Sequence, residues 1–226
     1  MYVQGNIAGE VTDDTTQMYE MAKAILQAKG QLSVEDAARA LVGWSKHYPK
    51  YYPRNAGTTT RYVIEELKNG LDPTEVGKTG GIYGRGTSNG AAMRIAGAGL
   101  RHPKDMDGAM ETAITMTKPS HGTQHAYAGA CAIACGIAKA MSEDADVFSV
   151  LKACLYGAKK GEERGCQEAR IAAGEAILPK IMRAVHVALT TDTMEDTLTQ
   201  LDAYVGNDGS IQSSVASAIG IFLAVE

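Results

Sequence analysis

The sequence is poor in aromatic side chains, with only two Phe and one Trp among 226 residues, whereas it contains 25 Gly and much alanine. An aromatic-rich β-sheet core is therefore disfavoured, because strands prefer aromatic and β-branched residues. Small side chains instead favour close contact between helices. The composition predicts an all-α protein. Because no internal repeat, linker or low-complexity tract interrupts it, residues 1–226 are expected to form a single domain.

The sequence also lacks a concentrated positive charge and any long apolar run. Its formal net charge is −4, which argues against a nucleic-acid partner, because such surfaces need clustered Lys and Arg to neutralise phosphates. No stretch of 18 apolar residues occurs, and no charged leader precedes an apolar segment. We therefore expect no membrane partner and a cytoplasmic location.

Cysteine is scarce as well, and its spacing fits no zinc framework. The four positions are Cys131, Cys135, Cys154 and Cys166. Since free cysteine is among the most frequently buried residue types, we expect four buried, reduced thiols rather than metal ligands.

Capping signals and helical periodicity divide the chain into helices joined by short turns. Ser33 and Asp36 form a capping box that predicts the start of one helix. In the second half, helices are expected over residues 120–141, 144–159, 162–187 and 193–204. The basic pair Lys159-Lys160 then marks a solvated helix end, and Pro179 is expected to kink or divide the helix around it.

A hydroxyl and two adjacent carboxylates, Thr12, Asp13 and Asp14, stand where a loop gives way to the first helix. Two interpretations follow from the residues alone. They can form an ordinary N-cap with an acidic first turn. Alternatively, they can bind a hard cation, because Mg²⁺, Mn²⁺ and Ca²⁺ prefer such oxygen ligands.

Between residues 77 and 90 the chain is rich in glycine, interleaved with Thr87, Ser88 and Asn89. Glycines allow a backbone to approach a ligand closely, and a helix starting near Gly90 would direct its free N–H groups at a phosphate or pyrophosphate. A flexible surface connection is the alternative. His121, expected in the first turn of the 120–141 helix, should be neutral and directed at a ligand or the backbone.

Four segments together resemble the ADP-ribosylglycohydrolase family, and they follow one another in the family's order. The segments are Gly9-Glu10-Val11-Thr12-Asp13-Asp14-Thr15, Ser88-Asn89-Gly90-Ala91-Ala92-Met93-Arg94-Ile95, Ser120-His121-Gly122-Thr123 and Ser213-Ser214-Val215-Ala216-Ser217-Ala218-Ile219. The resemblance implies an all-α globule with a two-metal Mg²⁺ or Mn²⁺ site in a cleft. It also implies a metal-dependent hydrolase that cleaves an ADP-ribosyl, or related ribosyl, N- or O-glycosidic bond. The implied partner is an ADP-ribosylated protein or an ADP-ribose-like small molecule.

The resemblance also assigns roles to individual residues. Thr12, Asp13 and Asp14 would be metal ligands. The loop of Gly86, Thr87, Ser88, Asn89 and Gly90 would cradle the diphosphate of ADP-ribose. His121 would lie nearby in the cleft rather than in the core, and Asn207 would approach the adenosine end. No catalytic acid or base is assigned, and Glu10 is interpreted as a supporting or surface group.

Two family elements have no counterpart in this sequence. Only eleven residues precede Thr12, where the family usually has a helix with a G-D-A-x-G signature. The sequence also reaches Glu226 without the family's G-G-D-x-D-T motif, which would complete the metal site. The alternatives to an active hydrolase are therefore a non-catalytic binding or crystallin-like family member, a fragment with an incomplete metal site, or a helical protein whose T-D-D-T motif is a coincidental cap.

Overall fold

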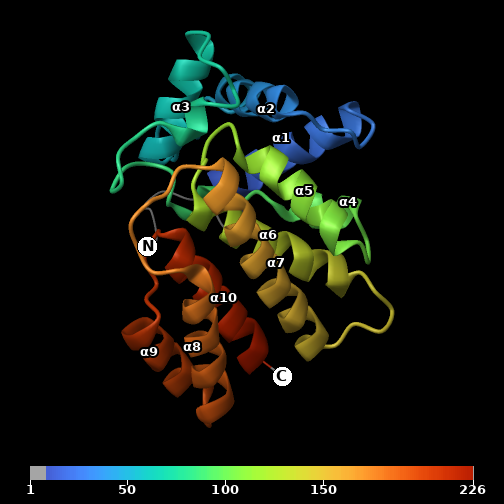
Figure 1. Cartoon of the computed structure of the whole chain (residues 1–226), viewed down its shortest axis with the longest axis vertical. Helices are drawn as coiled ribbons and strands as arrows, with labels where there is room; N and C mark the ends of the chain where they lie inside the picture. The colour runs from blue at the N-terminus through green and yellow to red at the C-terminus, as the bar shows by residue number, and fades with distance from the viewer. Residues whose placement is uncertain (1–8, 226) are drawn as a thin grey trace.

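The computed structural model describes residues 9–225, in which helices form all the named elements and no strand occurs (Figure 1). The helices are α1 (Asp13–Gln27), α2 (Val34–His47), α3 (Thr58–Lys68), α4 (Ala96–Arg101), α5 (Met106–Thr117), α6 (Gln124–Ala140), α7 (Val147–Glu168), α8 (Ile177–Thr190), α9 (Met194–Tyr204) and α10 (Ile211–Ala224), with short 3₁₀ turns η1 (Val76–Lys78) and η2 (Asn89–Ala91). The all-α prediction is confirmed. Among these helices, none combines the length and the apolar character that a bilayer crossing would need.

Helix α6 forms the centre of the fold, with α7 running alongside it (Figure 1). Glycines of α7 permit this close approach: a Cβ added at Gly157 would lie 2.3 Å from the carbonyl oxygen of Cys131, and one at Gly161 would lie 2.6 Å from that of Tyr127. A side chain at either position would push the two helices apart. The small residues therefore do what the composition predicted, because they bring helix backbones into contact.

Helices α1 and α2 pack together and fix the position of Thr12, Asp13 and Asp14, which we call the acidic motif. The indole of Trp44 in α2 is fully buried, and its Nε1 donates to Thr16 Oγ1 in α1 at 2.9 Å. The capping box of Ser33 and Asp36 is present at the start of α2. The first turn of α1, which carries Asp13, is thereby anchored to a neighbouring helix.

The expected helix boundaries are wrong between residues 159 and 177, whereas the helix expected over residues 193–204 is confirmed as α9. Helix α7 continues through Lys159 and Lys160 to Glu168, so the basic pair lies within a helix rather than at a solvated end. The break falls at residues 169–176, and Pro179 lies in the first turn of α8. Proline is tolerated there because the N–H groups of a first turn have no intrahelical acceptor, so no kink results.

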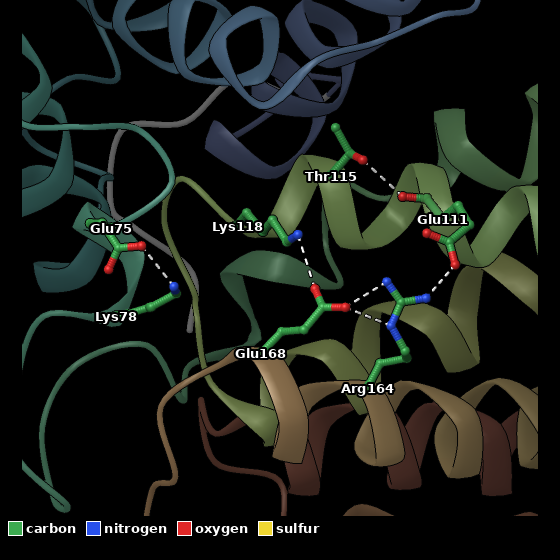
Figure 2. Close-up of polar contacts among 7 residues, drawn as sticks. All are labelled: Glu75, Lys78, Glu111, Thr115, Lys118, Arg164 and Glu168. Atoms are coloured by element: carbon green, nitrogen blue, oxygen red, sulfur yellow. Dashed lines mark hydrogen bonds and ion pairs between the residues drawn. The ribbon is translucent and has the colours of Figure 1, made fainter.

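The end of α7 is tied to α5 by an ion-pair network on the surface (Figure 2). Arg164 lies 2.5 Å from Glu111 of α5 and 2.7 Å from Glu168 of its own helix, measured between nitrogen and carboxylate oxygen. Lys118, which follows the last residue of α5, lies 3.0 Å from Glu168. The network therefore links the last turns of α7, which ends two residues before Arg170, to the end of α5.

The cysteine prediction holds for three of the four thiols. Cys131, Cys135 and Cys154 are free and buried, and burial raises their pKa values. Cys166 is exposed, which corrects the expectation. It lies near the end of α7, where one helical face remains open to solvent.

Candidate functional site

The acidic motif begins α1, but its hydroxyl is not used as a helix cap. Thr12 occupies the N-cap position with an extended backbone, and its side chain accepts no capping hydrogen bond from the described residues. Instead, Thr12 Oγ1 donates to Asp14 Oδ2 at 3.3 Å. The hydroxyl and the exposed carboxylate of Asp14 therefore form one group of oxygen atoms at the helix start.

Asp13 is held in an environment that disfavours its charge. Partial burial and the neighbouring charge of Asp14 raise the pKa of Asp13 to about 6. The side chain of Gln17, which is 1% exposed, donates from Nε2 to Asp13 Oδ2 at 3.1 Å. A bound cation would relieve both the repulsion and the desolvation of this carboxylate.

Few protein oxygens meet at this point. Within residues 9–225, no group of three or more His, Cys, Asp or Glu side chains could hold a metal ion. Two carboxylates and a hydroxyl nevertheless make an all-oxygen donor set. That chemistry fits Mg²⁺ or Mn²⁺, which keep several water ligands when proteins supply few.

A buried arginine lies directly behind the acidic motif. Arg94 is 1% exposed, and its guanidinium donates to Gln17 Oε1 at 2.5 Å and to Ser120 Oγ at 2.5 Å. A further contact of 3.2 Å joins it to His121 Nδ1. Burial lowers the pKa of Arg94 to about 10, with the charge of Asp13 opposing the shift, so the side chain stays protonated at neutral pH.

His121 lies in the core, which corrects its expected position in the cleft and in a first helical turn. Its ring is fully buried, and α6 begins three residues later, capped by the side chain of Thr123. Burial and the charge of Arg94 lower the pKa of His121 well below its usual value, so the imidazole is neutral, as expected. Its Nε2 lies 2.9 Å from Oγ of Ser88, which belongs to the glycine-rich stretch of residues 77–90, called the glycine loop below.

The glycine loop is held by the protein more firmly than its composition suggests. Gly86 has a φ of +93°. Its N–H donates to Thr59 Oγ1 at 3.1 Å, and its carbonyl accepts from Thr123 Oγ1 at 2.7 Å. The N–H of Asn89 donates to the carbonyl of Gly209 at 2.9 Å. At least two N–H groups of the loop are therefore used within the protein.

The expected helix starting near Gly90 is also wrong. The chain forms only the short turn η2 there, and α4 starts at Ala96. A Cβ added at Gly90 would lie 2.9 Å from the His121 ring, so the glycine makes room for the buried imidazole. No long helix directs its N-terminus at a phosphate from this position.

The loop that carries Asn207 lies against the glycine loop. Ile211 N–H donates to the carbonyl of Thr87 at 2.9 Å, and Ser88 forms an isolated antiparallel bridge with Ser210. Asn207 itself is exposed. Two segments that lie far apart in the sequence thus form one surface.

A polar cavity of about 560 Å³ opens beside the glycine loop. Its lining includes Thr58, Gly84, Arg85, Gly86, Thr87 and Ser88. The acidic motif, Asn89, Gly90, His121 and Asn207 lie outside this lining. The structure therefore brings part of the expected diphosphate loop to a cavity of ligand size and connects the acidic motif to it through the core.

Two arginines beside this cavity were not identified from the sequence. Arg85 lies over the ring of Tyr62, 3.6 Å from its centroid. Arg170 donates to the carbonyls of Gly81 and Arg85, and burial together with the charge of Arg85 lowers its pKa. Arg85 stands within the glycine run, which could have marked it. Arg170 lies far along the chain, and no local pattern marks it.

Comparison with known proteins places the chain among its relatives. The sequence model of the ADP-ribosylglycohydrolase family matches residues 1–226. The chain is 27% identical over 214 residues to the uncharacterized protein YegU of Escherichia coli strain K12. That match covers 94% of this chain but 60% of YegU, so the chain spans less than two thirds of this curated relative.

Proposed function

Because the chain belongs to the ADP-ribosylglycohydrolase family, we propose that it is a metal-dependent hydrolase of an ADP-ribosyl, or related ribosyl, N- or O-glycosidic bond. The proposed substrate is an ADP-ribosylated protein or an ADP-ribose-like small molecule. Family membership supports the glycohydrolase class. The metal, the bond and the substrate are our proposal.

One observation carries the proposal: a continuous chain of hydrogen bonds joins the acidic motif to the glycine loop. It runs from Asp13 through Gln17 to Arg94, and from there through His121 to Ser88. Buried polar groups are costly unless each is paired. Here buried polar groups are hydrogen-bonded to one another all the way from the acidic motif to the glycine loop. This continuity supports a single function for the two candidate sites.

At the metal end, Thr12, Asp13 and Asp14 would hold Mg²⁺ or Mn²⁺, with water filling further positions. The raised pKa of Asp13 supports this role, since the carboxylate pair is repulsive until a cation is present. When bound, the metal would orient ribose hydroxyls and lower the pKa of a bound water.

At the substrate end, the polar cavity would take the diphosphate of ADP-ribose. Gly86, Thr87 and Ser88 line it, together with Arg85, whose positive charge suits a phosphate. Asn89 and Gly90 would support the loop from behind. Asn207, on the adjoining loop, would contact the adenosine end.

The reaction itself needs few groups beyond those that orient the substrate. Water adds to the anomeric carbon, the glycosidic bond breaks, and the proton that the water loses goes to the departing nitrogen or oxygen. Holding the diphosphate in the cavity would fix the ribose relative to the acidic motif. The contribution of the glycine loop is therefore binding and orientation rather than proton transfer.

A second candidate is a binding protein without catalytic activity, such as a crystallin-like family member. The observation in its favour is the short donor set: the described residues offer two carboxylates and a hydroxyl, and no larger acidic or histidine cluster. Such a protein would bind ADP-ribose and fail to hold two metal ions.

Calorimetry of the protein with Mn²⁺, Mg²⁺ and ADP-ribose tests the proposal, followed by release of ADP-ribose from serine- and arginine-linked peptides. We expect divalent binding that Asp13→Asn and Asp14→Asn each weaken at least about tenfold, and metal-dependent release that EDTA stops. ADP-ribose binding without divalent binding would instead establish the second candidate. Binding of neither ligand would refute both.

A further inference from the structure

Arg94 lies in the middle of the hydrogen-bond chain set out above. A metal arm leads from it through Gln17 to Asp13, and a substrate arm leads through His121 to Ser88; these arms end at the two candidate half-sites. One nitrogen, Nη1, faces Gln17 in α1, and the other, Nη2, faces Ser120 and His121 before α6. A guanidinium can only donate, and it has no acceptor atom. Its place in the middle of the chain therefore sets the direction of every hydrogen bond on either side.

In the metal arm, donation by Arg94 fixes the orientation of the Gln17 amide. Because Arg94 donates, the atom of Gln17 that faces it at 2.5 Å must be the oxygen. The amide nitrogen then faces Asp13 Oδ2 as a donor, at 3.1 Å. The opposite amide orientation would place NH₂ against the guanidinium and an oxygen against the carboxylate, and both contacts would be repulsive.

On the substrate side, the same argument fixes the tautomer of His121. Its Nδ1 lies 3.2 Å from Arg94 Nη2 and 2.9 Å from Ser120 Oγ. The guanidinium cannot accept, and Ser120 Oγ, which accepts from Arg94 Nη2, can donate its own hydrogen to the ring. Nδ1 is therefore the acceptor, and in the neutral ring the proton is on Nε2. The Nε2–H then donates to Ser88 Oγ, 2.9 Å away. The hydroxyl hydrogen of Ser88 is left to point elsewhere, and Ser88 lines the polar cavity.

We propose that Arg94 is a positioning residue that prepares both candidate half-sites at once. It makes Gln17 a donor to Asp13, which leaves the other carboxylate oxygen, Oδ1, for a cation. It also makes Ser88 a hydroxyl donor towards a phosphate or ribose oxygen in the cavity. This inference rests on the proposed function for its ligands, but the hydrogen-bond directions rest on the geometry alone.

The directions are tested on the unmodified protein by ¹⁵N NMR of its histidine rings, with His121 assigned by comparison with His121→Gln. We expect the Nε2–H tautomer of a neutral ring for His121 between about pH 6 and 8. An Nδ1–H tautomer or an imidazolium in that range would overturn the inference, whether or not any ligand binds.

The coupling of the half-sites is tested by calorimetry on Gln17→Met and Arg94→Lys. Gln17→Met interrupts the metal arm alone, so Mn²⁺ affinity should fall about tenfold while ADP-ribose affinity in EDTA stays unchanged. Arg94→Lys keeps the charge but cannot reach both arms with fixed donors, so both affinities should fall about tenfold. Unchanged affinities in a folded Arg94→Lys protein would overturn the inference.

The outcomes separate this inference from the proposed function. If the unmodified protein binds neither Mn²⁺ nor ADP-ribose but His121 is the Nε2–H tautomer, the hydrogen-bond directions stand and the proposed function fails. If both ligands bind and His121 carries its proton on Nδ1, the proposed function stands and the role of Arg94 fails. Should Arg94→Lys not fold, the NMR measurement and Gln17→Met still decide.

Discussion

Replacing Asp13 by asparagine should make the metal-free protein more stable and, at the same time, poorer at binding a cation. The pKa of Asp13 is raised from 3.8 to about 6 by burial and by Asp14. A shift of about two units corresponds to about 3 kcal/mol, at roughly 1.36 kcal/mol per unit. Because the side chain is only partly buried, solvent screening reduces this value, and we expect a gain of about 1 to 2 kcal/mol.

The sign and the pH range follow from the same shift. Between pH 3.8 and about 6 the folded protein holds a proton on Asp13 that the unfolded chain has lost. The free energy of unfolding of the metal-free protein should therefore decrease as pH rises through this range and reach its lower value above about pH 6. The asparagine side chain of the Asp13→Asn variant does not titrate, so the advantage of this variant should be present at about pH 7 and absent below about pH 4.

Urea unfolding in EDTA at about pH 4 and about pH 7, repeated with Mn²⁺, measures both effects. Asp14→Asn is the comparison variant: it removes the exposed carboxylate that is the smaller of the two causes of the Asp13 shift, so it should stabilise the metal-free protein less than Asp13→Asn does. We expect Mn²⁺ to stabilise the unmodified protein and to stabilise neither variant to the same extent. A less stable Asp13→Asn protein at neutral pH in EDTA would refute the view that this carboxylate is held against its electrostatic preference.

Three further predictions concern single contacts. Arg170→Ala should weaken ADP-ribose binding about tenfold, or about 1.4 kcal/mol, because it removes the guanidinium that holds the loop through the carbonyls of Gly81 and Arg85; unchanged affinity in calorimetry would contradict this. Thr16→Val should lower the free energy of unfolding by about 2 kcal/mol by leaving the indole N–H of buried Trp44 without an acceptor, and urea unfolding that matches the unmodified protein would rule this out. Cys166 should be the one thiol that reacts rapidly with Ellman's reagent in the folded protein, so rapid reaction of more than one thiol would contradict the burial described.

Helix content was predictable from the sequence because its signals are local. The capping box of Ser33 and Asp36 lies within one helical turn, and the structure shows both of its hydrogen bonds. The end of α7 at Glu168 has no such signal. Its last turns make ion pairs to Glu111 of α5 and to Lys118 just beyond that helix, and these are tertiary contacts that a single segment does not encode.

The residue types of the candidate site were predictable, but the burial of its side chains was not. Motif and chemistry identified Ser88 and His121, and the structure places them 2.9 Å apart. That His121 is buried could not be read from its neighbours in sequence, since its position depends on Arg94 and on the space left by Gly90. In the sequence, Arg94 is marked only as one residue of the segment that resembles the family motif.

The position of Arg94 also explains why the acidic motif alone could not separate a helix cap from a metal site. A cap needs only local contacts within the first turn. Here Asp13 is held instead by Gln17, and Gln17 by an arginine 77 residues away. Burying a charge is costly unless its partners offset the lost hydration, so the guanidinium behind Asp13 depends on the hydrogen bonds that it makes there. The partners found here are an amide that faces Asp13 on one side and the imidazole that faces Ser88 on the other; under the proposed function, these partners would orient two ligand-facing oxygens.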